Sequence, residues 1–453
     1  MGGFSRSRKR AFYAAFFLLT AAAIFGLFSP AAECTTIYRV NKANIAGGDG
    51  SSWAEALNEA EFIHFMNNLG VPDHEFWIAQ GAYRPTQAAA DQTASFELKV
   101  GVALYGGFAG TETAREERDW KAHETILTGD IDEDGTLAEN SYHVVVSNSV
   151  SSFAVLDGFT ITGGNAVGAN HLDQNGGGML NLLGGPLVAN CIFRDNHAKF
   201  SGGAMANSSA PIIVKDCLFT GNTALTGIGG AISHFDDSEP RIYGCTFSAN
   251  KAASGGAVGS DTGLTVLVNC TFWSNEATFG GALWSLNSTP EIKNCTFLKN
   301  AAAGEGGGMY NDSSNPVVLN SIFWNGSGGE IVNKNGSVPA ISFSVVKGGY
   351  AGTSNLSSDP LLEDPADNGG PTPTCALPSG SPAVDSGTDT GAPTEDQRGI
   401  SRPQGAGMDM GAYELEQTAP PPPTPSGSSG GCSSFGLMGG IWLLLPLILL
   451  GRK

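Results

Sequence analysis

Charged side chains are scarce in this sequence, and positive charge is the scarcer sign. Asp, Glu, Lys and Arg make up 15% of the 453 residues, and 24 Lys and Arg stand against 43 Asp and Glu, which gives a formal net charge of −19. Such a surface repels the phosphates of nucleic acids and anionic lipid headgroups. The composition therefore excludes nucleic acid as a partner.

Several signatures of enzyme sites are also absent. The sequence has no phosphate-binding loop, no zinc-ligand spacing and no nucleophile elbow. Its central part has no stretch with apolar residues at helical spacing. Gly is abundant instead, with 63 residues, and 41% of the chain is hydrophobic. This composition is typical of an extracellular, all-β protein with many tight turns, and not of a disordered chain.

Residues 1–31 have the layout of a secretory signal peptide. Cations at positions 6, 8, 9 and 10 precede an apolar run at 11–28 and small residues at 29–32. An uncleaved membrane anchor is the alternative interpretation. Glu33 stands where a lipoprotein signal needs a small residue before its cysteine, which argues against lipidation at Cys34. We therefore expect an exported protein.

The other end of the chain combines a Pro/Gly/Ser linker at 417–431 with a short apolar segment and a basic end. The apolar run at 435–450 would span about 24 Å as a helix, less than a hydrocarbon core of roughly 30 Å. With Gly431-Cys432-Ser433 before it, this tail resembles the Gly-Gly, Myxo and Synerg types of C-terminal sorting signal of Gram-negative bacteria. The resemblance implies that residues 432–453 are a sorting and anchor segment, that an intramembrane protease removes the apolar part and that Cys432 or its neighbours carry the final anchor. A simple tail anchor is the alternative.

Two motifs alternate through the middle of the chain. A Cys-x-Phe-x-x-Asn motif follows a polar residue or Gly in five copies, and a sixth copy has decayed. Gly-Gly elements followed by a small and a hydrophobic residue alternate with them at steps of 25 to 27 residues. The first set begins at Asn190, Asp216, Gly244, Asn269, Asn294 and Asn320, and the second at Gly176, Gly202, Gly229, Gly255, Gly280 and Gly306. Two motifs in phase over six copies predict a solenoid.

Each copy has the pattern of short strands. The two-residue period of a strand places Cys191 and Phe193 on one face and Ile192 on the other. Three residues before each cysteine, or before Ser321 in the sixth copy, lies another apolar position, at Val188, Val214, Ile242, Leu267, Ile292 and Val318. We predict an all-β, right-handed, single-stranded parallel β-helix whose equivalent residues stack about 4.8 Å apart. A leucine-rich repeat is disfavoured because no helical segment separates the motifs.

The turns and the cysteines lead to three further predictions. The polar residue before each cysteine marks a bend between two strands. The asparagines that end the motifs are expected to adopt left-handed backbone conformations and to hydrogen-bond along the stack: Asn196, Asn222, Asn250, Asn275 and Asn300. The stacked cysteines, of which the sixth coil has Ser321 instead, are expected to be free thiols, with disulfide bridges as the alternative.

Less regular segments flank the repeats. Residues 32–75 are interpreted as an N-terminal cap with a helix over Trp53–Ala60, for which Ser51 or Ser52 would be the N-cap. Strand-like pieces at 76–79, 96–108, 125–128 and 143–147 would form the first coils. We therefore assign the β-helix to residues 76–350, with regular coils at 155–326, and a C-terminal cap to 351–416.

Phe219-x-x-Asn222 followed by Gly229-Gly-Ala-Ile232 resembles the repeat of the chlamydial polymorphic outer membrane proteins. The resemblance covers roughly residues 155–326 and implies a surface-displayed β-helix with an adhesive role. The chain departs from that family at its C-terminus, so display would depend on the tail described above.

The segment at 351–416 resembles a second family, the choice-of-anchor Q module, which follows β-helices and precedes various anchors. The resemblance rests on five short motifs in order: Asp359-Pro-Leu-Leu362, Asn368-Gly-Gly-Pro-Thr372, Ser381-Pro-Ala-Val-Asp-Ser-Gly387, Asp396-Gln-Arg-Gly399 and Asp409-Met-Gly-Ala-Tyr-Glu414. It implies a capping segment without catalytic function.

One segment has the start of a calcium loop. Asp130, Asp132 and Asp134 alternate before Gly135, but position 141, where an EF-hand loop closes with Glu, is Ser. The nearest acid is Glu139. We consider a structural Ca²⁺ ion and a solvated acidic turn as the two interpretations, and expect no other cofactor.

The strongest functional alternative is a polysaccharide lyase or hydrolase acting on acidic glycans, since both need clustered carboxylates. The tightest cluster in the repeats is Asp236, Asp237 and Arg241, with His234 nearby. Neighbouring coils have no acids at the equivalent places, which favours an exposed turn. The sequence thus predicts an exported, surface-anchored, adhesive or structural β-helix without catalytic activity, whose ligand is an unidentified carbohydrate or host or matrix protein.

Overall fold

A computed structural model describes residues 36–68 and 73–417. The predicted signal peptide and the tail with Gly431, Cys432 and Ser433 lie outside the described residues. Within the described ranges, no helix has the length and hydropathy needed to cross a membrane.

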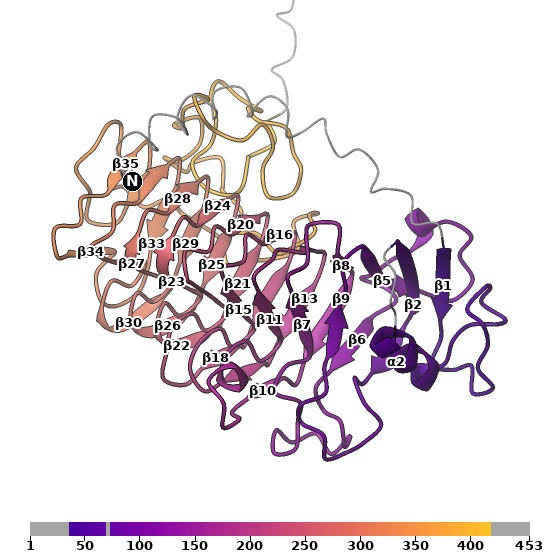
Figure 1. Ribbon diagram of the computed structural model, residues 1–453. Coiled ribbons are helices and arrows are strands. Elements are labelled where there is room, and N and C mark those ends of the chain that lie inside the picture. The colour runs from indigo at the N-terminus through magenta and orange to yellow at the C-terminus, as the bar shows by residue number, and fades with distance from the viewer. Residues whose placement is uncertain (1–35, 69–72, 418–453) are drawn as a thin grey trace, which may run out of the picture. The chain divides into compact units, whose positions relative to one another are not determined.

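Residues 36–346 form the predicted right-handed parallel β-helix (Figure 1). Each regular coil contributes one strand to each of four parallel sheets. The chain passes through these sheets in the order A, B, D and C, and every strand pairs in parallel with its equivalent in the next coil. The fold prediction is therefore confirmed, with strands and tight turns between the Gly-Gly and Phe-x-x-Asn elements.

Sheets A and B follow one another along the chain. Sheet A contains β1 (Thr36–Val40), β2 (His74–Ala79), β5 (Val102–Phe108), β8 (Val155–Asp157), β12 (Leu187–Ala189), β16 (Ile213–Lys215), β20 (Arg241–Tyr243), β24 (Val266–Val268), β28 (Glu291–Lys293), β32 (Val317–Leu319) and β35 (Ala340–Ser342). Sheet B contains β3 (Gly81–Tyr83), β6 (Thr125–Thr128), β9 (Phe159–Thr162), β13 (Ile192–Arg194), β17 (Leu218–Thr220), β21 (Thr246–Ser248), β25 (Thr271–Trp273), β29 (Thr296–Leu298), β33 (Ile322–Trp324) and β36 (Val345–Val346).

The other two sheets complete each coil. Sheet C contains β4 (Phe96–Leu98), β7 (Val145–Asn148), β11 (Met179–Leu182), β15 (Met205–Ser208), β19 (Ile232–Phe235), β23 (Val258–Gly263), β27 (Leu283–Ser288), β31 (Met309–Asp312) and β34 (Ile331–Lys334). Sheet D contains β10 (Asn165–Ala166), β14 (His197–Ala198), β18 (Thr223–Ala224), β22 (Lys251–Ser254), β26 (Glu276–Phe279) and β30 (Ala301–Glu305). Two 3₁₀ turns, Arg115–Glu117 and Leu172–Gln174, lie in connections.

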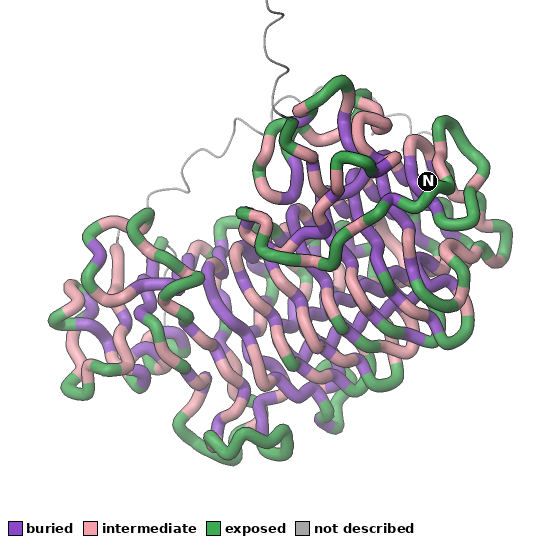
Figure 2. Tube along the Cα trace, turned by 180° about the vertical axis from the view of Figure 1, so that it is seen from behind, coloured by how far each residue is buried: buried purple, intermediate pink, exposed green. Residues whose placement is uncertain are grey.

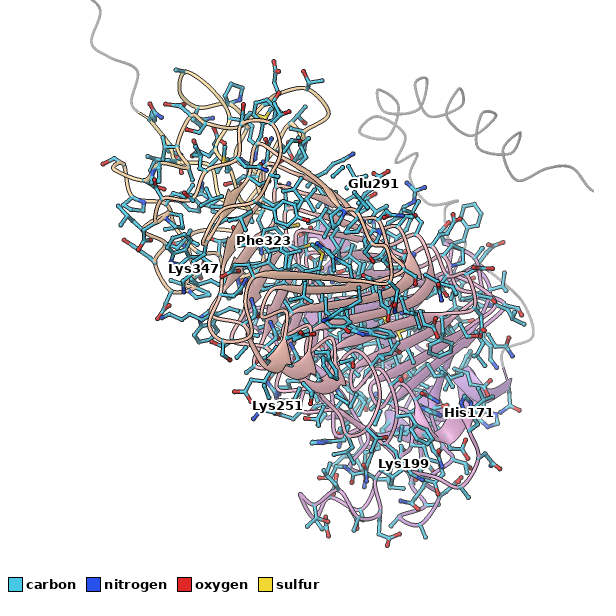
Figure 3. The ribbon with its side chains drawn as sticks, turned by 90° about the vertical axis from the view of Figure 1, so that its left-hand side faces the viewer. His171, Lys199, Lys251, Glu291, Phe323 and Lys347 are labelled. Atoms are coloured by element: carbon cyan, nitrogen blue, oxygen red, sulfur yellow. The ribbon has the colours of Figure 1, made fainter. Side chains whose placement is uncertain are left out.

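The interior of the β-helix is built from columns of identical side chains. Six fully buried phenylalanines stack face to face, with ring centroids 4.4–5.0 Å apart and interplanar angles of 4–9°. Phe323 ends this column inside the coil, whereas Lys199 and Lys251 project from the side of sheet D (Figure 3). Buried residues recur at the same place in successive coils (Figure 2), as the two-residue strand period predicts.

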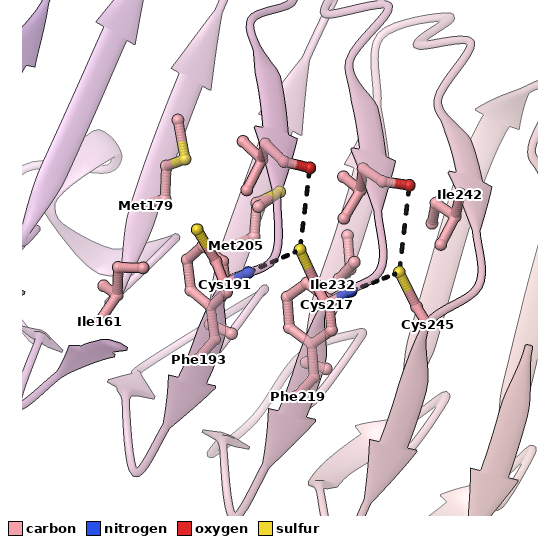
Figure 4. Packing of buried hydrophobic residues seen from close by; sticks show 14 of the residues in the cluster. Ile161, Met179, Cys191, Phe193, Met205, Cys217, Phe219, Ile232, Ile242 and Cys245 are labelled. Carbon is pink, nitrogen blue, oxygen red and sulfur yellow. Dashed lines mark hydrogen bonds between the residues drawn. The ribbon is translucent and has the colours of Figure 1, made fainter. Parts of the chain in front are cut away.

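The cysteine column beside the phenylalanines supplies hydrogen-bond acceptors (Figure 4). The backbone N–H of Cys191 donates to Sγ of Cys217 at 3.4 Å, and that of Cys217 donates to Sγ of Cys245 at 3.4 Å. At the last coils the acceptor is a hydroxyl, because the N–H of Cys295 donates to Oγ of Ser321 at 3.2 Å. The cysteines of the column are buried free thiols, as predicted.

The asparagine column is the most extensive buried polar feature. The Oδ1 atom of each asparagine accepts the backbone N–H and the Nδ2–H of the asparagine one coil earlier, at 2.7–3.1 Å. Asn325 continues the column in the decayed sixth copy, although its turn is one residue shorter. The prediction that these asparagines hydrogen-bond along the stack is confirmed.

The predicted left-handed backbone of these asparagines is wrong. Positive φ angles fall one residue earlier, at Asp195, Gly221, Ala249, Ser274 and Lys299. The asparagine itself must point its amide into the coil to meet its neighbours, so the preceding residue, which is exposed or half-buried, makes the turn. The bend before each cysteine is where the sequence predicts it, since Asn190, Asp216, Gly244, Asn269 and Asn294 all have positive φ angles.

The N-terminal helix is displaced from its predicted position. Helix α2 spans Glu59–Asn68. Residues 53–57 form turns, and Leu57 makes an isolated parallel bridge with Val40, the last residue of β1. Asn58 and Glu61 form a capping box, since each side chain accepts the other's backbone N–H at 2.9–3.0 Å. Trp53 instead packs on Phe108, with centroids 5.7 Å apart. The helix buries Phe62 and Met66 and closes the end of the core.

We expect Asn250→Ala to destabilise the protein by roughly 2–5 kcal/mol, because the backbone N–H of Asn222 loses its acceptor, Nδ2 of Asn222 loses one of its acceptors and the carbonyl of Phe219 loses a donor. The measurement is the urea unfolding midpoint. The control is Lys251→Ala, which removes the next, exposed side chain and its surface ion pair with Glu276. Equal midpoints for the two variants would contradict this role of the column.

Candidate functional site

The predicted calcium loop lies between β6 and β7. Carboxylate oxygens of Asp130, Asp132 and Asp134 lie within 4.8 Å of one another. One oxygen of Asp130 accepts the N–H of Gly135 at 3.1 Å, and the other is buried without a hydrogen bond, as is Oδ1 of Asp132. The structure therefore brings the three predicted side chains together and leaves oxygens able to coordinate a cation. Carboxylate oxygens are the ligands that Ca²⁺ prefers.

The loop is tied to the N-terminal cap and contains further buried oxygens. Glu133, between the aspartates, pairs with Arg84 at 3.4 Å and with Lys42 at 3.9 Å. Oδ1 of Asn140 and Oγ of Ser141 are buried and have no partner among the described residues. Glu139, the nearest acid in the sequence, is exposed and is not part of the cluster. An ion at this place would stiffen the connection between coils without acting in catalysis.

We expect millimolar Ca²⁺ to raise the thermal unfolding midpoint and to release or absorb heat in a calorimetric titration, since extracellular calcium modules bind at about 10⁻⁴ to 10⁻³ M. Asp132→Asn should abolish both effects. Asp195→Asn, in an exposed turn of another coil, is the control that should retain them. If the unaltered chain shows neither effect, the cluster is a solvated acidic turn.

The candidate catalytic residues Asp236 and Asp237 lie in the turn between β19 and β20, and Arg241 is the first residue of β20. Oδ2 of Asp236 accepts the hydroxyl of Ser208 at 2.6 Å, and the N–H of Asp237 donates to the hydroxyl of Thr262 at 3.1 Å. Both aspartates have positive φ angles, as expected of a tight turn. No hydrogen bond or ion pair among the described residues joins either of them to Arg241. The geometry is that of a turn bound to the coils on either side.

His234 is buried inside the β-helix and cannot reach a substrate. It continues an interior polar column in which Ser147 donates to Asn181 at 2.6 Å and Asn181 donates to Asn207 at 2.8 Å. The amide Nδ2 of Asn207 lies 3.1 Å from Nδ1 of His234, which accepts its hydrogen, so the ring is neutral. Burial lowers the pKa of His234 from 6.5 to about 3.

We expect His234 to make the fold acid-sensitive. Because its pKa is lower in the folded than in the unfolded chain, its contribution to stability is complete above pH 6.5 and declines by about 1.4 kcal/mol per pH unit as the pH falls toward 3. His234→Asn, which extends the Asn181 and Asn207 pattern, should remove this decline. The measurement is the difference between the two proteins' urea midpoints at pH 7 and pH 4.5. A constant difference would show that His234 does not titrate on unfolding.

The C-terminal module (residues 351–416) contains a dense assembly of buried polar side chains that its sequence motifs do not indicate. Arg402 and Glu414 form a fully buried ion pair at 2.8 Å, and Arg402 also donates to the carbonyls of Asp409 and Gly411. Arg398 pairs with Asp396 at 2.8 Å. Asp396, Arg398, Asp409 and Glu414 belong to the last two motifs of the module, and Arg402 lies between these motifs and joins them.

The C-terminal module docks on the outer face of sheet B. Gln397 donates to the hydroxyl of Thr246 at 2.8 Å and accepts that of Thr271 at 2.7 Å, and the N–H of Ala412 donates to the hydroxyl of Thr296 at 2.9 Å. The asparagines at the bends before the cysteine positions also bind the module, since the side-chain amides of Asn269, Asn294 and Asn320 donate to its carbonyls. The outward threonines of successive coils are buried for this reason.

Comparison with known proteins supports the fold and no more. The family model of the right-handed β-helix region matches residues 130–278 and 186–346. No curated protein matches the chain. Among solved structures, pectate lyase Pel9A aligns with a TM-score of 0.47 and 13% identity over 84% of this chain and 96% of that chain. A substituted pectate lyase from Xanthomonas campestris aligns with a TM-score of 0.28 and 10% identity, covering 61% and 78%. At this similarity neither enzyme bears on the activity of the chain.

Proposed function

We propose that this chain is an exported β-helix protein displayed at the surface of a Gram-negative bacterium, where it serves in adhesion or as a structural component of the envelope. The observation that carries the proposal is the way the C-terminal module is fastened to the β-helix. Its hydrogen bonds reach several successive coils: the hydroxyl of Thr372 donates to the carbonyl of Gly244, and the amide of Asn320 donates to the carbonyl of Thr388.

Such a contact suits an attachment better than a moving lid. The interface contains buried hydrogen bonds between Gln397 and the threonines of two coils, and an apolar cluster of Ile322, Val345, Leu377, Ala383 and Met410. Opening it would expose both the polar and the apolar groups. A module of this kind connects the β-helix firmly to the residues that follow Gln417, where the sequence predicts the linker and the sorting signal.

The alternative function, cleavage of acidic glycans, depends on Asp236, Asp237 and Arg241. Oδ2 of Asp236 accepts the hydroxyl of Ser208, and no hydrogen bond or ion pair among the described residues joins Asp236 or Asp237 to Arg241. The proposal therefore assigns the turn a structural role. Incubating the purified chain with acidic polysaccharides, with and without Ca²⁺, should release no new reducing ends. Depolymerisation that is lost in both Asp237→Ala and Arg241→Ala would instead support the enzyme.

Surface display can be tested by treating intact cells with an external protease. We expect an epitope inserted after Gly336, in an exposed turn, to be removed from intact cells that express the full chain. Cys432→Ala should lower the amount of surface-attached protein several-fold, because the sorting motif is lost. Cys34→Ala is the matched control and should have no effect. Protection of the epitope in intact cells, with cleavage only after lysis, would contradict the proposal.

A further inference from the structure

A groove of about 310 Å³ lies where the C-terminal module ends its contact with the β-helix. Its floor is the outer face of β13 and β17, one wall is the loop that contains Trp120 and Glu124, and the other wall is the module segment at 367–373. Its volume is at the lower end of the range for small-molecule sites. The groove is therefore large enough for a small ligand and too small for a protein domain.

Both walls are fixed in place. Nζ of Lys121 donates to the carbonyl of Gly370 at 2.8 Å and joins the two walls. The hydroxyl of Thr372 donates to the carbonyl of Gly244 at 2.8 Å and holds the module to the next coil. The groove is thus preformed, which lowers the entropic cost of binding.

The residues of the floor depart from the pattern of the coils that the module covers. At the outward position of sheet B the covered coils have Thr246, Thr271 and Thr296, whereas the groove has Ile192 and Leu218. These two apolar side chains are half-buried and not covered by the module. Together with Trp120, Pro371 and Pro373 they give the groove an apolar surface for a flat, hydrophobic face of a ligand.

Acidic side chains surround this apolar surface. Glu124, Asp216 and Asp367 line the groove, and Lys121 is the one cationic side chain that lines it. Each carboxylate has one oxygen engaged, by Arg194 at Glu124, by Lys215 at Asp216 and by the N–H of Gly369 at Asp367. Within the described part of the chain, the second oxygen of each accepts no hydrogen bond. Three acceptors are therefore available to hydroxyl groups.

The electrostatics of the groove disfavour an anionic ligand. Burial raises the pKa of Asp216, and the nearby carboxylates of Asp157 and Glu395 raise it further, while Lys215 lowers it. A ligand with carboxylates would add to this repulsion. The groove therefore suits a ligand that offers hydroxyl donors and apolar C–H faces without negative charge.

We propose that the groove binds a short neutral glycan, whose ring stacks on Trp120 and whose hydroxyls donate to Glu124, Asp216 and Asp367. This inference rests on the proposed function, since it names the ligand class of an adhesive surface protein. It differs from the acidic glycan of the enzymatic alternative.

The test is a calorimetric titration of the full chain, purified in mild detergent, with cellohexaose, maltohexaose and xylohexaose, and with hexagalacturonate as the acidic probe. At least one neutral hexasaccharide should bind, and hexagalacturonate should bind more weakly or not at all. Trp120→Ala should weaken binding tenfold or more. Trp284→Ala, which removes a half-buried Trp from the outer face of sheet C, is the matched control and should bind as the unaltered chain does.

A second variant guards against misfolding of Trp120→Ala. Leu218→Thr gives the groove the residue that the covered coils already have at this position, so the coil should fold, and binding should weaken several-fold. The proposal is wrong if no neutral hexasaccharide binds, if hexagalacturonate binds best, or if Leu218→Thr binds with unchanged affinity. Because the titration uses purified protein, it can fail while the cell-surface test succeeds, and the reverse also holds.

Discussion

The amide column of Asn196, Asn222, Asn250, Asn275, Asn300 and Asn325 sets the geometry on which the remaining structure depends. From Asn222 onward, each Oδ1 accepts two hydrogens from the coil before, so each coil must lie at one height and in one register relative to the next. The phenylalanine stack and the cysteine acceptors require the same spacing. An amide one coil out of place would leave two donors and one acceptor buried without partners.

Because the inward side chains fix the register of the coils, the outward side chains can differ from one coil to the next. The outward position of sheet B is Ile, Leu, Thr, Thr, Thr and Ile over six coils, and the changes from Leu to Thr and from Thr to Ile coincide with a change in what lies above it. The threonines meet the hydrogen-bonding groups of the C-terminal module, Ile322 meets its apolar cluster, and Ile192 and Leu218 floor the groove. The residue at each outward position of sheet B thus depends on what that coil contacts.

Sequence reasoning succeeded where a contact recurs and was incomplete where it occurs once. The inward Cys and Phe positions repeat in every copy, so strand period and spacing suffice to place them. Helix α2 is predicted too early in the chain because Ser51 and Ser52 are also suitable N-cap residues. In the structure Asn58 is the N-cap, and Trp53 lies outside the helix and packs on Phe108. The contact of Gln397 with Thr246 joins residues 151 apart and belongs to no repeat, so no local pattern indicates it. The calcium loop motif did predict that three aspartates come together, since they are neighbours in the chain.

The buried cysteine column has a consequence for the exported protein that we propose, which would leave the reducing compartment in which it is made. Thiols react with oxidants and exchange with disulfides as thiolates, and burial raises the pKa of Cys191, Cys217, Cys245 and Cys295. Once the coils close, these sulfurs have neither the charge nor the solvent access that oxidation requires. If the chain is exported as we propose, these thiols are open to oxidation only before the coils stack, and the folded protein protects them by burial and not by disulfide bridges.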